Sequence, residues 1–142
     1  MRASVVTRPL DPSALLREVS DEQHGAIALF VGTVRSVNEG REVKAIEYTA
    51  YESMAEREMS AVLSEAEQQH AGVVLAAEHR IGLLEVGEAS IAIAAAHAHR
   101  GQALDALRYA IDEIKNRAPI WKREMYADGS ESWVDPTHSA AR

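Results

Sequence analysis

Four cationic side chains are concentrated between Lys115 and Glu124, where the sequence reads Lys-Asn-Arg-Ala-Pro-Ile-Trp-Lys-Arg-Glu. The apolar spacing before this segment predicts a helix that stops before Pro119 and places Lys115 at the border between core and solvent. A partly desolvated lysine, or one beside a second cation, has a lowered pKa and suits proton transfer or attack on an acyl carbon. The alternative is that cations in a last helical turn only stabilise the final carbonyl groups.

Lys122 and Arg123 follow in a stretch that we expect to be extended, where successive side chains point to opposite faces. Only one of the two therefore faces the same pocket as Lys115. The alternative is a solvated charge pair that Glu124 balances.

A second cationic group, His97-Ala98-His99-Arg100-Gly101, lies where a predicted strand ends and a helix begins. Free backbone N–H groups and the helix dipole favour an anion at such a point, and His99 and Arg100 add further donors. These features predict a phosphate site. The alternatives are a solvated Arg100, a core His97 bonded to backbone, or a metal held by His97 and His99, for which no further ligand has the right spacing.

The composition restricts the classes of protein that remain. The chain has 142 residues, no cysteine and a formal net charge of −7, which fits one domain without disulfides or a cysteine nucleophile. An acidic chain is poorly suited to nucleic acid, and no apolar run approaches the roughly 20 residues that cross a bilayer. We expect a cytoplasmic protein with neither nucleic acid nor membrane as partner.

The apolar periodicity predicts three helices, four strands and a C-terminal hairpin. The helices are expected at 12–19, 53–69 and 101–117, the strands at 26–34, 43–51, 73–80 and 89–97, and a hairpin at 121–134. Strand 26–34 reads as covered on both faces, with Gly32 marking a bulge or a close backbone approach, and 43–51 as its antiparallel partner. The last helix has a predicted apolar stripe of Leu104, Leu107, Ile111 and Ile114. We expect one α+β domain at 1–134, an antiparallel or mixed sheet with packed helices, and a flexible tail at 135–142.

Several short segments, in this order, resemble the family of the large, catalytic subunit of molybdopterin synthase. They are Gly25-Ala26, Phe30-Val31-Gly32-Thr33-Val34-Arg35, His79-Arg80-Ile81-Gly82, Gly87-Glu88, Ala98-His99-Arg100 and the segment from Lys115 to Glu124. The last segment is the most specific, and the resemblance runs from about residue 5 to Val134.

The resemblance implies an α/β-hammerhead-like fold and a sulfurtransferase of molybdenum cofactor biosynthesis that itself needs no cofactor. Such an enzyme inserts two sulfurs into cyclic pyranopterin monophosphate. A small ubiquitin-like carrier with a C-terminal Gly-Gly thiocarboxylate delivers the sulfur, and a homodimer binds two carriers to form a heterotetramer. A sulfurtransferase without cysteine depends on such a carrier.

The resemblance also implies site residues. Lys115 and Lys122 are the expected catalytic residues. The expected substrate contacts are Thr33, Val34, Arg35, His99, Arg100, Arg123 and Glu124. Two positions differ from the family pattern, because Thr33 stands where the family often has a lysine, and no arginine follows Trp133-Val134.

Helix geometry adds a constraint on the site. Fifteen residues at about 1.5 Å each separate Arg100 from Lys115 by roughly 22 Å. If both residues bind one substrate, the pocket is shared across a two-fold dimer interface.

Two alternatives to a sulfurtransferase remain. One is a dimeric binding module for an anionic metabolite or a ubiquitin-like tail, and the other is a metal-dependent hydrolase that uses His79, His97 and His99.

Overall fold

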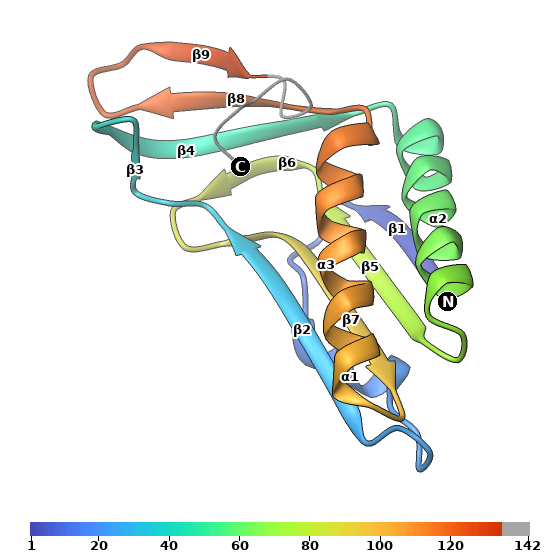
Figure 1. Cartoon of the computed structure of the whole chain (residues 1–142). Coiled ribbons are helices and arrows are strands. Elements are labelled where there is room, and N and C mark those ends of the chain that lie inside the picture. Colours follow the sequence, from blue (N-terminus) through green and yellow to red (C-terminus); the bar gives the residue numbers. More distant parts are fainter. Residues whose placement is uncertain (135–142) are drawn as a thin grey trace.

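The computed structural model describes residues 1–134, and the predicted tail at 135–142 lies outside the described residues. The strands are β1 (Arg2–Val6), β2 (Ala26–Thr33), β3 (Val37–Asn38), β4 (Arg41–Ala50), β5 (Val74–Arg80), β6 (Gly82–Glu85), β7 (Ala89–His97), β8 (Ile120–Tyr126) and β9 (Glu131–Val134). The helices are α1 (Pro12–Val19), α2 (Glu52–Gln69) and α3 (Arg100–Arg117) (Figure 1). No helix in this described part is long and apolar enough to cross a membrane.

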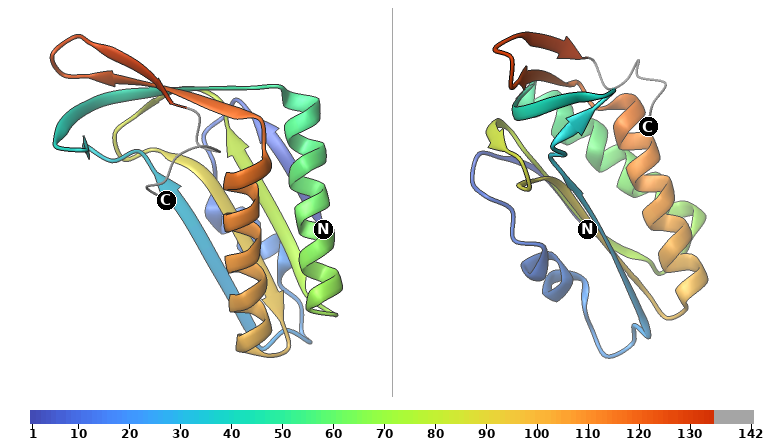
Figure 2. Two further views of the ribbon diagram at one scale, coloured as in Figure 1. Left: turned by 45° about the horizontal axis from the view of Figure 1, so that its top comes forward. Right: turned by 90° about the vertical axis from the view of Figure 1, so that its left-hand side faces the viewer.

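A four-stranded mixed sheet forms the body of the molecule, in the order β1-β5-β7-β2. β1 is parallel to β5, whereas the β5–β7 and β7–β2 pairs are antiparallel. Helices α2 and α3 lie side by side on one face of this sheet, and α1 lies on the other (Figure 2). The structure confirms the predicted α+β domain with a mixed sheet.

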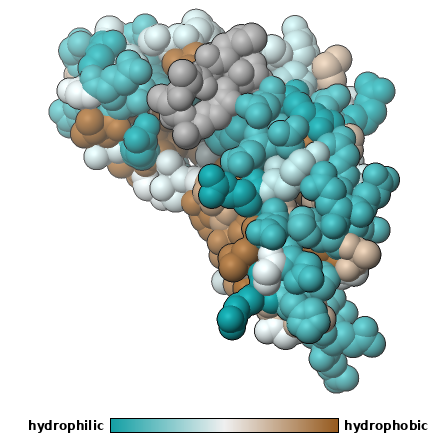
Figure 3. All heavy atoms as spheres, in the orientation of Figure 1, coloured by the Kyte–Doolittle hydropathy of each residue, from teal (hydrophilic) through white to brown (hydrophobic). Residues whose placement is uncertain are grey.

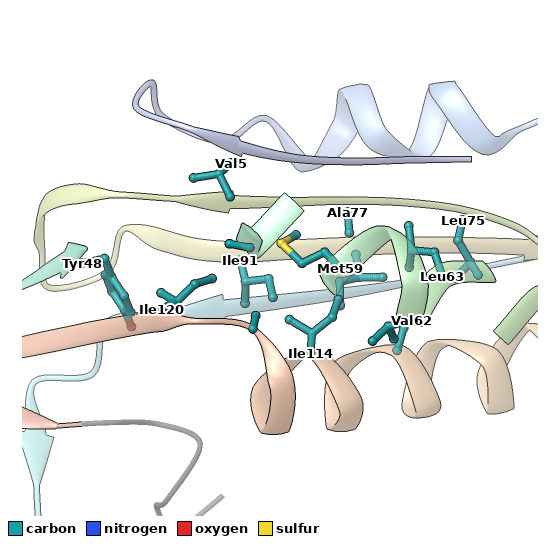
Figure 4. Close-up of a cluster of buried hydrophobic side chains, with 14 of the residues drawn as sticks. Val5, Tyr48, Met59, Val62, Leu63, Leu75, Ala77, Ile91, Ile114 and Ile120 are labelled. Atoms are coloured by element: carbon teal, nitrogen blue, oxygen red, sulfur yellow. The ribbon is translucent and has the colours of Figure 1, made fainter. Parts of the chain in front are cut away.

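Central strand β7 is buried on both faces because α2 and α3 cover one face of the sheet and α1 covers the other. Ile91 and Ile93 point into the larger core, which Met59, Leu63 and other residues of α2 and α3 complete (Figure 4). On the opposite face, the methyl groups of β7 pack with α1. The residues of this second cluster are Leu15, Val19, Ala76, Ala92, Ala94 and Ala96. Small side chains on that face let a short helix approach the sheet closely.

A second sheet, in the order β3-β4-β8-β9, forms an arm across one end of the body, and β6 pairs with β4 (Figure 1). The predicted hairpin at 121–134 is confirmed as β8 and β9. The predicted pairing of 43–51 with 26–34 is wrong, because β2 pairs with β7 and β4 pairs with β8. The ladder of β2 shifts register between Gly32 and Thr33, where a bulge or a close backbone approach was expected, and the chain then leaves for the second sheet. The segment 82–87, between two of the predicted strands, contains the further short strand β6, which was not predicted.

Strand β2 is not covered on both faces, contrary to the prediction. Ile27 is 43% exposed and Leu29 is 37% exposed. β2 is the last strand of its sheet, and α1 packs mainly over β5 and β7. Figure 3 shows apolar surface along β2 beside the polar outer surface of α3.

The buried stripe of α3 also differs from the predicted one. Its buried residues are Ala103, Ala106, Ala110 and Ile114. Leu104 is 55% exposed, and Leu107 and Ile111 are only partly buried. The alanines let α3 pack closely on α2 and β7, so the larger side chains lie beside the contact. The apolar spacing predicted the helix but not the direction it faces.

Candidate active site

A cavity of about 530 Å³ lies in the angle between the two sheets, beside α3. Its walls are Phe30, Gly32, Thr33, Arg35, Asn38, Val43, Ile46, Tyr48, Ser90, Arg108, Ile111, Asp112, Lys115, Lys122 and Glu124. The size suits a small molecule, and the lining combines apolar side chains with a few charged groups, as ligand sites commonly do.

Helix α3 contributes a row of polar side chains to this cavity. Arg108, Asp112 and Lys115 are spaced by four and three residues, which places them on one helical face. Arg108 donates from Nε to Asp112 at 3.4 Å. Lys115 is partly buried, as its position at the border of the predicted stripe indicated. The sequence interpretation missed Arg108 and Asp112, although their spacing from Lys115 was a usable signal.

Strand β8 contributes Lys122 and Glu124 from one face. The Glu124 side chain is only 1% exposed, and its Oε1 lies 3.2 Å from Lys122 Nζ. Asn38 donates to both carboxylate oxygens, at 3.1 and 2.8 Å, and the Tyr126 hydroxyl donates to Oε2 at 3.0 Å. Burial acts to raise the pKa of Glu124, but the Asn38 amide, Lys122 and Tyr126 outweigh it and leave the pKa below its usual value. Glu124 is therefore a buried anion that holds the Lys122 side chain in place.

Asn38 links this pair to Arg35. The Arg35 guanidinium donates to Asn38 Oδ1 at 3.3 Å, so a continuous polar chain runs from Arg35 through Asn38 and Glu124 to Lys122. The sequence interpretation missed Asn38 because an asparagine before Glu39-Gly40 reads as an ordinary turn residue.

Two neighbours of Arg35 have different positions. Thr33 lines the cavity, whereas Val34 is 3% exposed and does not. The backbone of Val34 accepts from Gly87 N–H at 2.9 Å and donates to Glu88 O at 3.0 Å. Val34 therefore fixes the segment that carries Arg35.

Arg123 points away from the cavity. Its guanidinium pairs with Glu47 of β4 at 2.5 Å and with Glu131 of β9 at 3.3 Å, and it lies 5.4 Å from the centre of the Trp133 ring. As the alternation of an extended strand predicted, only one residue of the Lys122-Arg123 pair faces the cavity, and the structure shows that it is Lys122.

His99 and Arg100 are also absent from the walls of this cavity. His99 is the N-cap residue of α3, and the helix runs without interruption from Arg100 to Arg117. Arg100 and Lys115 thus lie near opposite ends of one straight element, roughly 22 Å apart by helical rise. One chain cannot bring both to the same small ligand.

His79 is a buried neighbour of Lys115 that the cavity does not expose. It is 3% exposed, its Nδ1 donates to Arg80 O at 2.9 Å, and its ring meets Tyr48 edge-on at 5.1 Å. His79, Tyr48 and Lys115 share a small internal space of about 20 Å³. Burial, with the charge of Lys115 as a second cause, lowers the pKa of His79 to about 3. The imidazole beside Lys115 is therefore neutral at physiological pH.

The three histidines of the hydrolase alternative do not form a metal site. No group of three or more His, Cys, Asp or Glu side chains within residues 1–134 is arranged to hold a metal ion. His97 bonds to backbone through both ring nitrogens, at 3.0 Å to Ala71 O and 3.0 Å from His99 N. These bonds leave His97 without a lone pair for a metal.

The sequence agrees with a known family over most of its length. The family model described as MoaE protein matches residues 5–117. The chain belongs to the MoaE family. The matched MoaE region includes Arg35, His99, Arg100 and Lys115 and ends before Lys122.

Curated MoaE relatives are named molybdopterin synthase catalytic subunit. The Oryza sativa subsp. indica protein is 47% identical over 126 residues, which are 89% of this chain and 65% of the relative. The Bacillus subtilis protein is 38% identical over 94% of this chain and 84% of its own length. The Thermoplasma volcanium protein is 40% identical over 91% of this chain and 94% of its own length. This chain spans slightly less than two thirds of the rice protein.

Solved structures of MoaE proteins share the fold. Molybdopterin synthase from Staphylococcus aureus superimposes with a TM-score of 0.88 at 32% identity, over 92% of this chain and 95% of that chain. The Burkholderia ambifaria MoaE protein gives 0.84 at 31% identity, over 99% and 92%. These similarities confirm the predicted MoaE fold.

Proposed function

We propose that this chain is the catalytic subunit of a molybdopterin synthase, which converts cyclic pyranopterin monophosphate to molybdopterin with sulfur from a carrier thiocarboxylate. The observation that carries the proposal is the shared cavity of Lys115, Lys122 and Arg35. Their side chains give an otherwise acidic chain one local cationic site for an anionic substrate and an anionic sulfur donor. The family membership and the names of the relatives support the same activity.

The sulfur donor is a small ubiquitin-like carrier whose Gly-Gly tail enters the cavity. This chain has no cysteine, so it cannot hold the sulfur as a persulfide of its own. The thiocarboxylate sulfur first attacks a carbon of the pterin side chain and displaces an oxygen from it, which joins carrier and pterin in a thioester. Attack of water on the acyl carbon of this thioester then forms a tetrahedral oxyanion, which breaks down as the bond between the acyl carbon and sulfur breaks. The sulfur stays on the pterin and the carrier leaves as a carboxylate. An ammonium group at Lys115 or Lys122 stabilises that oxyanion.

The proposed roles follow the positions of the side chains. Lys115 and Lys122 act on the reacting groups, while Arg35 and Thr33 contact the substrate and Glu124 holds Lys122. Arg123 and Val34 act from outside the cavity, where they fix β8 and the Arg35 segment. His99 and Arg100 bind the substrate phosphate in the cavity of a second subunit.

A homodimer with one carrier on each subunit, a heterotetramer, follows from this arrangement. The exposed apolar face of β2, with Ile27 and Leu29, is the surface we assign to the second subunit. A two-fold axis near the middle of β2 and α3 brings the Arg100 end of one helix toward the Lys115 end of the other. We place the reaction in the cytoplasm.

The direct test supplies the protein with thiocarboxylated carrier and cyclic pyranopterin monophosphate and measures the dithiolene product. We expect product with the wild type and a loss of at least about 100-fold with Lys115→Ala. Lys44 is the matched control because it is the one lysine of the chain besides Lys115 and Lys122, is exposed on β4 and lies outside the cavity.

Each outcome has a defined meaning. No product with the wild type would overturn the proposed function, and binding of pterin and carrier without turnover would favour the binding module. Full activity of Lys115→Ala, or an equal loss with Lys44→Ala, would overturn the role of Lys115.

A further inference from the structure

The turn that carries His99 and Arg100 is fixed by a buried side chain. His97, the last residue of β7, is 8% exposed and lies just before this turn. Its ring bonds to backbone on two sides, to Ala71 in the segment after α2 and to His99 at the start of α3. A side chain with this position controls where the first residues of α3 lie.

The two bonds define one form of the His97 ring. A carbonyl oxygen only accepts, so Nε2 must carry the hydrogen that it donates to Ala71 O at 3.0 Å. A backbone N–H only donates, so Nδ1 must carry the lone pair that receives His99 N–H at 3.0 Å. His97 is therefore the neutral Nε2–H tautomer. Loss of the Nδ1 acceptor would release the His99 amide.

The other side of the turn is held by a close backbone approach. A Cβ added at Gly25 would lie 2.8 Å from Ala98 O, closer than real Cβ atoms come to backbone. Gly25 precedes β2, whose first residue, Ala26, is in register with His97. The peptide between His97 and His99 is thus confined by Gly25 on one side and by the His97 ring on the other.

No other described side chain fixes the position of the His99 backbone. His99 is the N-cap of α3 but makes no side-chain capping bond within the described part of the chain. The His97 and His99 rings lie 5.9 Å apart and are tilted by 46°, so the second imidazole does not replace the first. The position of the His99 backbone depends on His97 Nδ1.

We infer that His97 is a positioning residue that holds the His99-Arg100 turn in the conformation that binds the substrate phosphate. The inference rests on the proposed function, which assigns His99 and Arg100 to that phosphate. His97 itself does not touch the substrate, because it is buried beneath the turn. Its replacement should change substrate affinity rather than the rate at saturation.

Two substitutions separate this role from a merely structural one. In His97→Asn, Oδ1 takes the place of Nδ1 and can still accept from His99 N–H, whereas the bond to Ala71 is lost. In His97→Gln, the amide nitrogen takes the place of Nε2 and can still donate to Ala71 O, whereas the bond to His99 is lost. Each variant loses one of two bonds, so the two should lose similar thermal stability.

The measurements are KM for the pterin, kcat, the dissociation constant for inorganic phosphate, and hydrogen exchange at the His99 amide. For His97→Gln we expect KM and the phosphate dissociation constant to rise about three- to tenfold, which corresponds to one lost hydrogen bond. We also expect faster exchange at His99 and an unchanged kcat. His97→Asn should keep all four values within about twofold of wild type.

Equal changes in the two variants, or a fall in kcat without a change in KM, would overturn the inference. A wild type that formed no dithiolene would instead overturn the proposed function. In that case the phosphate dissociation constants and the His99 exchange rates still decide the role of His97.

Discussion

Lys122 and Glu124 lie two residues apart on one face of β8, and Lys122 Nζ is 3.2 Å from Glu124 Oε1. The carboxylate is buried at 1% exposure and also accepts two hydrogen bonds from Asn38. A buried carboxylate with this many donors organises the charged wall of the cavity. Loss of the Glu124 charge should therefore disturb Lys122 and Asn38 together.

Glu124→Gln should destabilise the protein and reduce synthase activity. The new amide group turns a donor toward the Asn38 amide and leaves Lys122 without its anion. We expect the free energy of unfolding at neutral pH to fall by about 1–3 kcal/mol in chemical denaturation. Glu131→Gln, on the opposite face of the arm and partly exposed, is the control and should cost less than about 1 kcal/mol. Equal effects would contradict the special role of Glu124.

The stability of the wild type and of Glu124→Gln should depend differently on pH. The folded pKa of Glu124 lies below its usual value, so its stabilising contribution is present above the unfolded pKa. That contribution is lost as the pH falls through the folded pKa. Melting temperatures measured between neutral and acidic pH should therefore fall more steeply for wild type than for Glu124→Gln.

Mixed dimers test whether the pocket is shared. A dimer of one Lys115→Ala chain and one Arg100→Ala chain has both substitutions in one pocket and an intact second pocket. We expect it to recover about half of the wild-type dithiolene formation, whereas each parental homodimer is impaired. A dimer of Lys115→Ala with Lys122→Ala is the control, because both lysines serve the cavity of their own chain and no recovery is expected. Recovery no greater than the parents for the first pair would contradict a shared pocket.

The apolar surface of β2 predicts where the dimer forms. Ile27→Glu combined with Leu29→Glu places two charges on an exposed apolar strand, and we expect a shift from dimer to monomer in light scattering. Activity should fall with the dimer, because His99 and Arg100 no longer reach a second cavity. Met54→Glu, at an apolar residue of α2 that is 50% exposed, is the control and should remain dimeric. A double variant that stays dimeric would show that β2 is not the interface.

The environment of His79 predicts an unusual titration. Nitrogen NMR should show His79 in the neutral Nδ1–H form down to a pKa of about 3. Lys115→Met removes the neighbouring cation and should raise this pKa, whereas Lys44→Met should not change it. The unfolded chain takes up this proton near pH 6.5, so His79 should lower stability progressively as the pH falls from 6.5 toward 3. A wild-type His79 that titrates near 6.5 would contradict this arrangement.

The sequence predicted those features of the fold that depend on local periodicity. The apolar residues of α2, from Ala55 to Ala66, recur at helical spacing in the sequence and are fully buried, because an amphipathic helix has one apolar stripe to bury. Strand pairing was harder to predict, and the partner of β4 was assigned wrongly. Pairing depends on which distant segment reaches the strand edge, and the register of β4 with β8 leaves no local sequence signal.

The residues of the candidate site were likewise predicted where the sequence carries a local signal and missed where it does not. Its lysines were recognised because they lie in a distinctive segment, and strand alternation predicted that one of Lys122 and Arg123 would face away. Arg108 was missed because an arginine paired with Asp112 at four residues is typical of an exposed helix surface. Only the second sheet, which lies across the end of the body, makes that helix surface a wall of the cavity.

The alternation along β8 makes the identity of the cation in the cavity a matter of register. A slip of one residue in the pairing of β8 with β4 would turn Lys122 outward and present the guanidinium of Arg123 to the substrate. The turn around Gly129, with a φ of +88°, and the Arg41 guanidinium stacked 3.6 Å from the Tyr126 ring hold the far end of the hairpin in place. The contact between Arg41 of β4 and Tyr126 of β8, several residues from the chemistry, thus helps to determine whether an ammonium or a guanidinium enters the cavity.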